Sequence, residues 1–189
     1  IFTNKFRTTY IIYYLIGQVA YSTALGLKML TLTNYLNFTD SAATKYFLII
    51  GILADIIGIV ALKFLTPKND YITITIKFGI RFLGYTLAFL SNNIVVVICA
   101  MSCSLLVSTA YENVTDAPYI NSIELDKQLA YTNLRYMVGS LGEAIGTFLC
   151  GIMYAIGLRY MFGLSAFFML AQLTLAYILI HQRRKLNIK

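Results

Sequence analysis

The sequence predicts an all-α membrane protein built from six transmembrane helices. Only 12% of the residues are charged and the mean hydropathy is +0.72, whereas about 25% of the residues in an ordinary soluble domain are charged. The apolar residues fall into six blocks, each close to the roughly 20 residues that a helix needs to cross the hydrocarbon core of a bilayer. An eight-residue pattern also occurs twice, in the second and the fifth block. Residues 1–189 are therefore expected to form one helical bundle made of two related halves.

Each predicted span ends where polar residues interrupt the apolar block. Residues 34–44 are rich in polar side chains, residues 66–70 read Thr-Pro-Lys-Asn-Asp, and residues 91–93 read Ser-Asn-Asn. Such residues are typical of turns. Residues 113–131 form the longest predicted connection. The six spans are predicted at residues 9–31, 46–65, 71–90, 94–112, 132–156 and 160–180.

The distribution of lysine and arginine predicts the orientation of the chain, because cytoplasmic flanks collect these residues. With the N-terminus inside, the inner flanks hold Lys5, Arg7, Lys63, Lys68, Lys127, Arg135, Arg183, Arg184, Lys185 and Lys189. The outer side holds Lys28, Lys45 and Arg159. Both termini of this multi-pass protein are therefore expected in the cytoplasm, with the helices in the cell membrane. The formal net charge of +7 follows from this orientation, and nucleic acid is not expected as a partner.

The repeated pattern is an acid framed by glycines. Gly51-Ile-Leu-Ala-Asp55-Ile-Ile-Gly58 and Gly139-Ser-Leu-Gly-Glu143-Ala-Ile-Gly146 both read Gly, any residue, Leu, small residue, acid, any residue, Ile, Gly. An acid inside a bilayer costs about 2.5–3.5 kcal/mol on insertion scales, so an acid at the same point of two spans indicates a use for it. Glycines let helix backbones approach closely in lipid. The alternative is coincidence in a chain that is 59% hydrophobic and holds 12 glycines.

The order of the spans predicts how the two patterns are related in space. With six spans, the second and the fifth cross the membrane in opposite directions, as an inverted repeat of three plus three helices requires. Residues 9–90 and 94–180 are then the two repeats. Asp55 and Glu143 become pseudo-symmetry mates near the midplane of the bilayer.

One stretch of the sequence resembles a known family. Arg135-Tyr-Met-Val-Gly139-Ser-Leu-Gly142-Glu-Ala-Ile-Gly146, followed by Gly151-Ile-Met-Tyr154, is similar to the fifth span of the proton-coupled sugar permeases of the major facilitator superfamily. The six spans and the inside loop between the fourth and the fifth also resemble one half of such a transporter. The resemblance implies half of a major facilitator fold, whose partner is a second six-helix half across a solute cavity.

The loop between the second and the third span departs from the family pattern. It reads Lys63-Phe-Leu-Thr-Pro-Lys68-Asn-Asp70, whereas this loop in the family usually carries Gly-x-x-x-Asp-Arg/Lys-x-Gly-Arg/Lys. The motif degenerates more often in the second half of such transporters. Together with the basic tail at Arg183 and a first residue, Ile1, that is not Met, the departure favours a C-terminal half.

Asp55 and Glu143 are the candidates for carrying a coupling proton, because burial raises the pKa of a carboxylate toward the range in which it exchanges protons. Asp55 has an equally good interpretation as the ion-pair partner of Arg81, which falls in the middle of the next span. Glu143 has no basic residue near it at helical spacing except Arg135, two turns away. It is therefore the better proton carrier, with a helix-packing or cavity-lining role as the alternative.

Other polar residues within the spans are candidates for contact with a polar solute, since such residues turn toward the bundle interior. Hydrogen bonding between helices explains them equally well, and an arginine at the inner end of a span also serves as an anchor. Lys77 is expected to extend to the inner membrane surface. The candidates for ion pairing or solute contact are Arg81, Arg135, Gln18, Tyr21 and Asn133, together with Gln172.

The sequence gives little support for enzyme chemistry. Its single histidine, His181, lies in the basic tail, which removes most zinc sites and the usual pairs of histidine with serine or cysteine. Cys99 and Cys103 share a helix face as packing residues rather than as a metal pair. The sequence holds no Gly-Lys-Ser/Thr loop of the kind that binds phosphate. We therefore expect no catalytic residues, no metal and no cofactor.

The function predicted from these patterns is secondary active transport. The expected solute is small and polar or amphipathic, the expected coupling ion is the proton, and the two halves rock so that a midplane site faces alternate sides. Two alternatives fit the same composition: a drug or lipid exporter of this fold with a more apolar cavity, and a six-span subunit that scaffolds a membrane complex without transport. The expected partners are the lipid bilayer, the other half of the transporter, the solute and protons.

Overall fold

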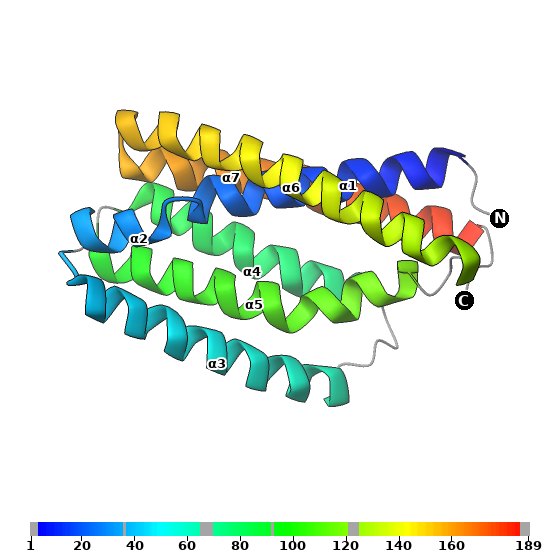
Figure 1. Cartoon of the computed structure of the whole chain (residues 1–189), viewed down its shortest axis with the longest axis horizontal. Helices are drawn as coiled ribbons and strands as arrows, with labels where there is room; N and C mark the ends of the chain where they lie inside the picture. The colour runs from blue at the N-terminus through cyan, green and yellow to red at the C-terminus, as the bar shows by residue number, and fades with distance from the viewer. Residues whose placement is uncertain (1–3, 36, 65–69, 92, 121–124, 186–189) are drawn as a thin grey trace.

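The computed structural model describes residues 4–35, 37–64, 70–91, 93–120 and 125–185, and almost all of this part is helical (Figure 1). Some side chains in these ranges are outside the description, among them those of residues 61–64 and 108–120. The long helices run side by side as one bundle, with the first turn of the first helix and the last turn of the last helix at the same end. They are α1 (Asn4–Leu25), α3 (Asp40–Phe64), α4 (Asp70–Leu90), α5 (Ile94–Ile120), α6 (Leu125–Ile156) and α7 (Leu158–Lys185).

The helix of the first predicted span is interrupted near its C-terminal end. After Leu25 the chain passes through Gly26 into a short helix, α2 (Lys28–Leu30), and a π-helical turn, η1 (Thr31–Tyr35). A side chain at Gly26 would collide with both neighbours, because an added Cβ would lie 2.5 Å from the carbonyl oxygen of Ser22 and 3.0 Å from the hydroxyl of Thr147 on α6. The break therefore coincides with a close approach of α1 and α6.

The longest predicted connection, residues 113–131, is mostly helical. α5 continues to Ile120 and α6 begins at Leu125. Hydropathy reports how much of a helix suits lipid, whereas a helix continues beyond the hydrocarbon wherever its residues favour the helical backbone. The prediction of a long loop was wrong for this reason.

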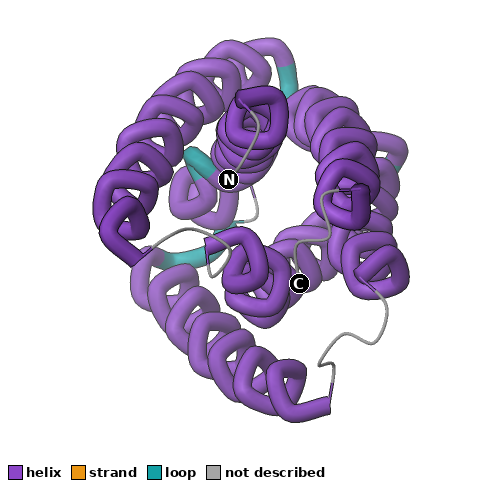
Figure 2. The backbone as a smooth tube through the Cα atoms, turned by 90° about the vertical axis from the view of Figure 1, so that its right-hand side faces the viewer, coloured by secondary structure: helices purple, strands orange, loops and turns teal. Residues whose placement is uncertain are grey.

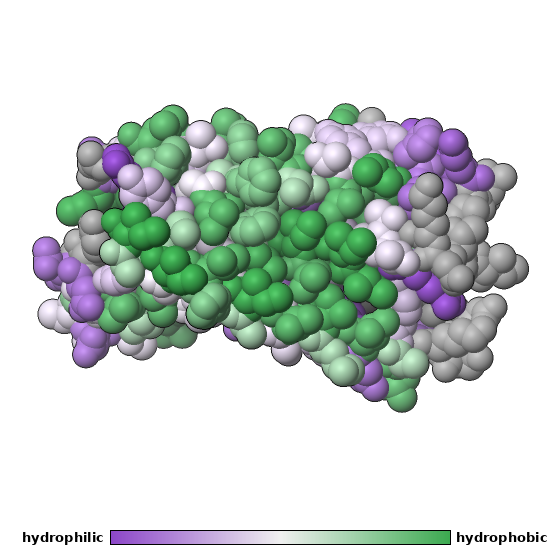
Figure 3. Space-filling model, turned by 90° about the horizontal axis from the view of Figure 1, so that it is seen from above, coloured by the Kyte–Doolittle hydropathy of each residue, from purple (hydrophilic) through white to green (hydrophobic). Residues whose placement is uncertain are grey.

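In the part of the chain that the structure describes, three helical stretches are long and apolar enough to cross a membrane: Phe6–Asn34, Gln128–Ile156 and Leu158–Lys185. A shorter apolar stretch, Ile94–Val107, lies in α5. Viewed from one side, the bundle carries a broad apolar band with hydrophilic residues toward both ends (Figure 3). Apolar surface of this extent marks contact with a membrane or a partner. The chain is therefore an all-α protein with helices suited to a membrane, and the full set of six spans stays a prediction.

Each long helix packs against one or more of the others in a definite pattern. α1 lies against α6 and α7, α4 lies against α5 and α7, and α3 lies against α5 at one edge of the bundle (Figures 1 and 2). Exchanging α1 with α5, α3 with α6 and α4 with α7 turns each of these pairs into a pair of the same set, and the pair α4–α7 is exchanged onto itself. One contact has no counterpart: α6 touches α7, whereas α3 and α4 make no comparable contact in the described residues.

A buried aromatic core joins α1, α4 and α7. The rings of Tyr13 and Phe78 meet edge to face with centroids 6.1 Å apart, and those of Tyr85 and Phe162 lie 6.1 Å apart. The hydroxyl of Tyr85 shares a hydrogen bond with Ser104 on α5, so its polar end is satisfied inside the core. These contacts fix the face that α4 turns toward the interior.

Candidate functional site

Two positive charges lie inside the bundle. Lys77 and Arg81 on α4 are 6% and 4% exposed, and they are the only buried charged residues among the described side chains. Because they are four residues apart, they lie on the same face of the helix, together with the buried residues Phe78 and Tyr85. The prediction that Lys77 extends to the membrane surface is therefore wrong.

The guanidinium of Arg81 faces α1. Its Cζ lies 5.8 Å from the centre of the Tyr21 ring, a distance at which a cation is attracted to the face of an aromatic ring. Two of its nitrogens, Nε and Nη2, are buried and have no hydrogen-bond partner in the structure. Leaving a buried charged donor unsatisfied is costly. The structure thus brings Arg81 and Tyr21 together, as two of the predicted site residues, and leaves hydrogen-bonding capacity on Arg81.

Gln172 brings a polar side chain into the interior from α7. It is 6% exposed and its Oε1 has no hydrogen-bond partner. It packs on the backbone of α1, since a Cβ added at Gly17 would lie 2.0 Å from its Nε2. Gly17 is one helical turn from Tyr21. α1, α4 and α7 therefore each contribute a polar or cationic group to the bundle interior.

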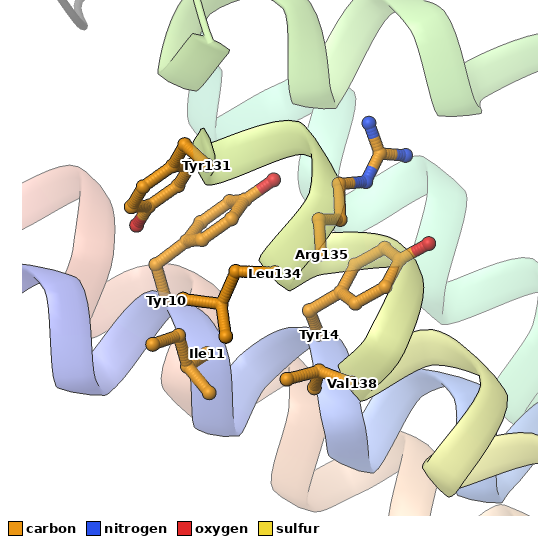
Figure 4. A pocket seen from close by; sticks show the side chains of 7 residues that line it. All are labelled: Tyr10, Ile11, Tyr14, Tyr131, Leu134, Arg135 and Val138. Carbon is orange, nitrogen blue, oxygen red and sulfur yellow. The ribbon is translucent and has the colours of Figure 1, made fainter. Parts of the chain in front are cut away.

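A small cleft lies between α1 and α6, where Arg135 sits beside a group of tyrosines (Figure 4). The Cζ of Arg135 is 4.8 Å from the centre of the Tyr14 ring, and the rings of Tyr10 and Tyr131 are 5.9 Å apart. The cleft has a volume of about 10 Å³, close to the space that one ordered water needs. It is too small for a solute, so the arrangement fits Arg135 as an anchor between two helices.

The two predicted proton carriers lie on the outside of the described bundle. Asp55 on α3 and Glu143 on α6 are both exposed. Asp55 is therefore not the partner of Arg81, which is buried on a helix that α3 does not pack against. The predicted ion pair was wrong because helical spacing shows which residues share a face, and does not show which neighbour that face meets.

The remaining predicted residues are divided between packing and surface positions. Gln18 is half-buried between α1 and α6, where its Cβ would lie 2.8 Å from a Cβ added at Gly142. Asn133 is exposed on α6 and is not brought near Arg81 or Tyr21 by any described contact. Among the described residues, no group of His, Cys, Asp or Glu side chains is placed to hold a metal ion.

Sequence reasoning missed the tyrosines around Arg135. Tyr10 and Tyr14 are four residues apart, as are Tyr131 and Arg135, so each pair occupies one face of its helix. That spacing was a usable signal for two facing aromatic surfaces. It did not show that α1 and α6 would be neighbours.

Comparison with known proteins gives no match: no family model matches the sequence, and no curated protein and no solved structure is significantly similar to the chain. Function is therefore argued from the arrangement of the residues themselves.

Proposed function

We propose that this chain is one six-helix half of a proton-coupled secondary transporter, which moves a small polar solute by alternating access. The observation that carries the proposal is the packing pattern of the long helices. Exchange of the first three with the last three turns every neighbour pair except α6–α7 into a pair of the same set, with α4–α7 exchanged onto itself. An inverted repeat of three plus three helices produces this exchange, and such repeats are typical of secondary transporters.

The ends of the bundle support the proposed orientation. Arg183, Arg184 and Lys185 lie in the last turn of α7, at the same end of the bundle as the first turn of α1 (Figure 1). Lys28 begins α2 and Arg159 is the second residue of α7, and both of these helix starts lie at the opposite end. Because lysine and arginine collect on the cytoplasmic side, the end with the tail of α7 is the cytoplasmic one in this proposal.

The exposure of Asp55 and Glu143 supports a partner that covers them. Asp55 lies among exposed apolar residues of α3, including Ile52 and Ile56, which are 53% and 52% exposed. Glu143 lies on α6 near Leu141, which is 55% exposed. Ionisable residues within a span almost always face a protein interior or a water-filled cavity. In this proposal, the second half of the transporter covers these two faces.

Glu143 is the proposed coupling residue. It forms no ion pair with any described residue, and the face of α6 beside it packs on α1 through Gly142 and Gly146. A carboxylate next to a close helix contact can respond when the helices shift, because its surroundings change with its access to water. Asp55, on the more loosely attached α3, is the second candidate.

The test is uptake into liposomes under an imposed pH gradient, with a pH-sensitive dye inside and a panel of small sugars and organic acids outside. The complete protein should carry protons inward together with one class of solute, and the signal should saturate. The chain alone should give no saturable signal, because its cavity wall would be open to lipid. Saturable transport by a proven monomer of this chain would contradict the half-transporter proposal. Solute uptake without proton entry would contradict proton coupling.

A further inference from the structure

We infer that the bundle interior binds its solute through a negatively charged oxygen group, a carboxylate or a phosphate, and that Arg81 is the residue that binds it. The inference rests on the proposed transport function and names the chemical class of its solute. It concerns Arg81 of α4 and Tyr21 of α1.

The first argument is charge. Arg81 is 4% exposed, and an arginine keeps its charge in proteins. The carboxylates whose side chains are described, Asp40, Asp55 and Glu143, are all exposed, and none of them forms an ion pair with Arg81. A buried guanidinium with unsatisfied donors and no ion pair to a described residue is strongly destabilising, so the position of Arg81 favours an anion.

The second argument is geometry. The nitrogens of Arg81 that lack a hydrogen-bond partner are Nε and Nη2. Their N–H bonds point in parallel along one edge of the guanidinium, which is the arrangement that binds two oxygens of a carboxylate or phosphate at once. The Tyr21 ring, 5.8 Å from Cζ, packs against the guanidinium and holds it in place. The edge that is left is therefore built for an oxyanion.

The third argument is depth, and it decides the source of the anion. Arg81 lies near the middle of α4, which runs from Asp70 to Leu90. At 1.5 Å per residue, it is about 14–16 Å along the helix from either end. A lipid phosphate stays at the membrane surface, so a dissolved solute is the source. Because Arg81 is enclosed, the solute reaches it when the helices around it open, as alternating access requires.

The experiment measures the thermal stability of the full chain in a neutral detergent. The probes are sodium acetate and inorganic phosphate, compared with sodium chloride at equal ionic strength. A saturable rise in Tm with acetate or phosphate, and no comparable rise with chloride, is expected because a ligand of the native state stabilises it. Phosphatidylglycerol in the detergent should not reproduce the effect. The absence of an anion-specific rise, or a rise with the lipid alone, would overturn the inference.

Two substitutions and a matched control locate the site. Arg81→Gln should abolish the anion-dependent rise in Tm. Arg81→Lys keeps the charge and loses the parallel donors, so the apparent affinity should fall roughly tenfold. Arg159→Gln removes an exposed arginine that also lies over a tyrosine ring, 5.1 Å from the centre of Tyr160, and should leave the anion effect intact. An unchanged effect in either Arg81 variant would overturn the inference.

If neither Arg81 variant folds, phenylglyoxal labelling of the unaltered chain decides the question. Peptide mass spectrometry should show that acetate or phosphate lowers the labelling of Arg81 several-fold and leaves Arg159 unchanged. Equal labelling of Arg81 with and without these anions, including no labelling in either case, would overturn the inference. Anion binding without gradient-driven uptake would contradict the transport proposal alone. Uptake of an uncharged solute without anion binding would contradict the anion site alone.

Discussion

The two eight-residue patterns share one sequence frame and lie in different surroundings. In residues 139–146, glycines face α1 closely: a Cβ added at Gly146 would lie 2.7 Å from the Cβ of Ser22 and 2.7 Å from the carbonyl oxygen of Val19. In residues 51–58, a Cβ added at Gly51 would meet nothing within 4 Å. The same pattern therefore packs closely on α1 at Gly146, whereas Gly51 has no close neighbour.

A sequence motif therefore determines the spacing of residues along a helix and does not determine which helix they contact. α6 is packed on α1 and touches α7, whereas α3 lies at the edge against α5. The surroundings of the two acids differ in the same way. Glu143 stands beside a tight helix contact, and Asp55 stands among exposed isoleucines. The two patterns should therefore respond differently to the same substitution.

The largest difference is expected in transport. Glu143→Gln should abolish gradient-driven accumulation by the complete protein and spare exchange of solute across the membrane, because a permanently neutral side chain imitates the protonated state. The measurement compares accumulation under a pH gradient with counterflow in liposomes. Asp55→Asn makes the same change at the second candidate, and it should retain accumulation because Glu143 is the proposed coupling residue. Accumulation that survives Glu143→Gln would assign the acid a structural role.

The next largest difference is expected in stability. Gly146→Ala should destabilise the fold by about 1–3 kcal/mol, as overpacking of a close contact does, because the new methyl group meets the backbone of Val19 and the side chain of Ser22. Thermal unfolding in detergent and the monodisperse fraction on size exclusion measure the effect. A variant as stable as the parent would show that α1 and α6 are not packed as closely as described.

Gly51→Ala makes the same substitution in the other pattern and should act in the opposite direction. The site is open and lies inside α3, so alanine should stabilise the helix by up to about 1 kcal/mol. The same unfolding measurement applies. A loss of stability comparable to that of Gly146→Ala would reveal a close packing partner for α3 in the purified protein.

The smallest effect is expected for Asp55→Asn on folding. If Asp55 neutralised Arg81, the substitution would strand a buried charge and cost several kcal/mol. Because Asp55 is exposed and does not contact Arg81, the change in unfolding free energy should stay within about 0.5 kcal/mol. A large loss of yield and stability in Asp55→Asn would indicate that Asp55 and Arg81 form an ion pair after all.

Hydropathy and glycine spacing predicted much of this molecule. Each predicted span overlaps one long helix, although the first, residues 9–31, continues past α1 into α2 and η1. The glycines of residues 139–146 lie at a close helix contact, as small residues should. Helix continuation over residues 113–131 was missed because polar residues end a span and do not have to end a helix. The break at Gly26 coincides with a close contact with Thr147 of α6, a neighbour that no local pattern reveals.

The candidate site was predictable in its residue types and less so in its pairings. Arg81 and Tyr21 were both recognised as polar residues within spans, and the structure brings them together. The assignment of Asp55 to Arg81 followed the order of the helices along the chain. Order along the chain is a poor guide here, since α3 packs on α5 rather than on α4. Tertiary packing decides which residues are buried and which are exposed, and the periodicity of a single helix does not predict that packing.

The most direct test of the inverted repeat is the depth of the two acids in a bilayer. Single spin labels would be placed at positions 55 and 143, after replacement of the free cysteines Cys99, Cys103 and Cys150, and their depth would be measured in liposomes by power-saturation electron paramagnetic resonance. The proposed repeat places both labels near the midplane at similar depth. A label near the headgroups at either position, or two clearly different depths, would contradict it.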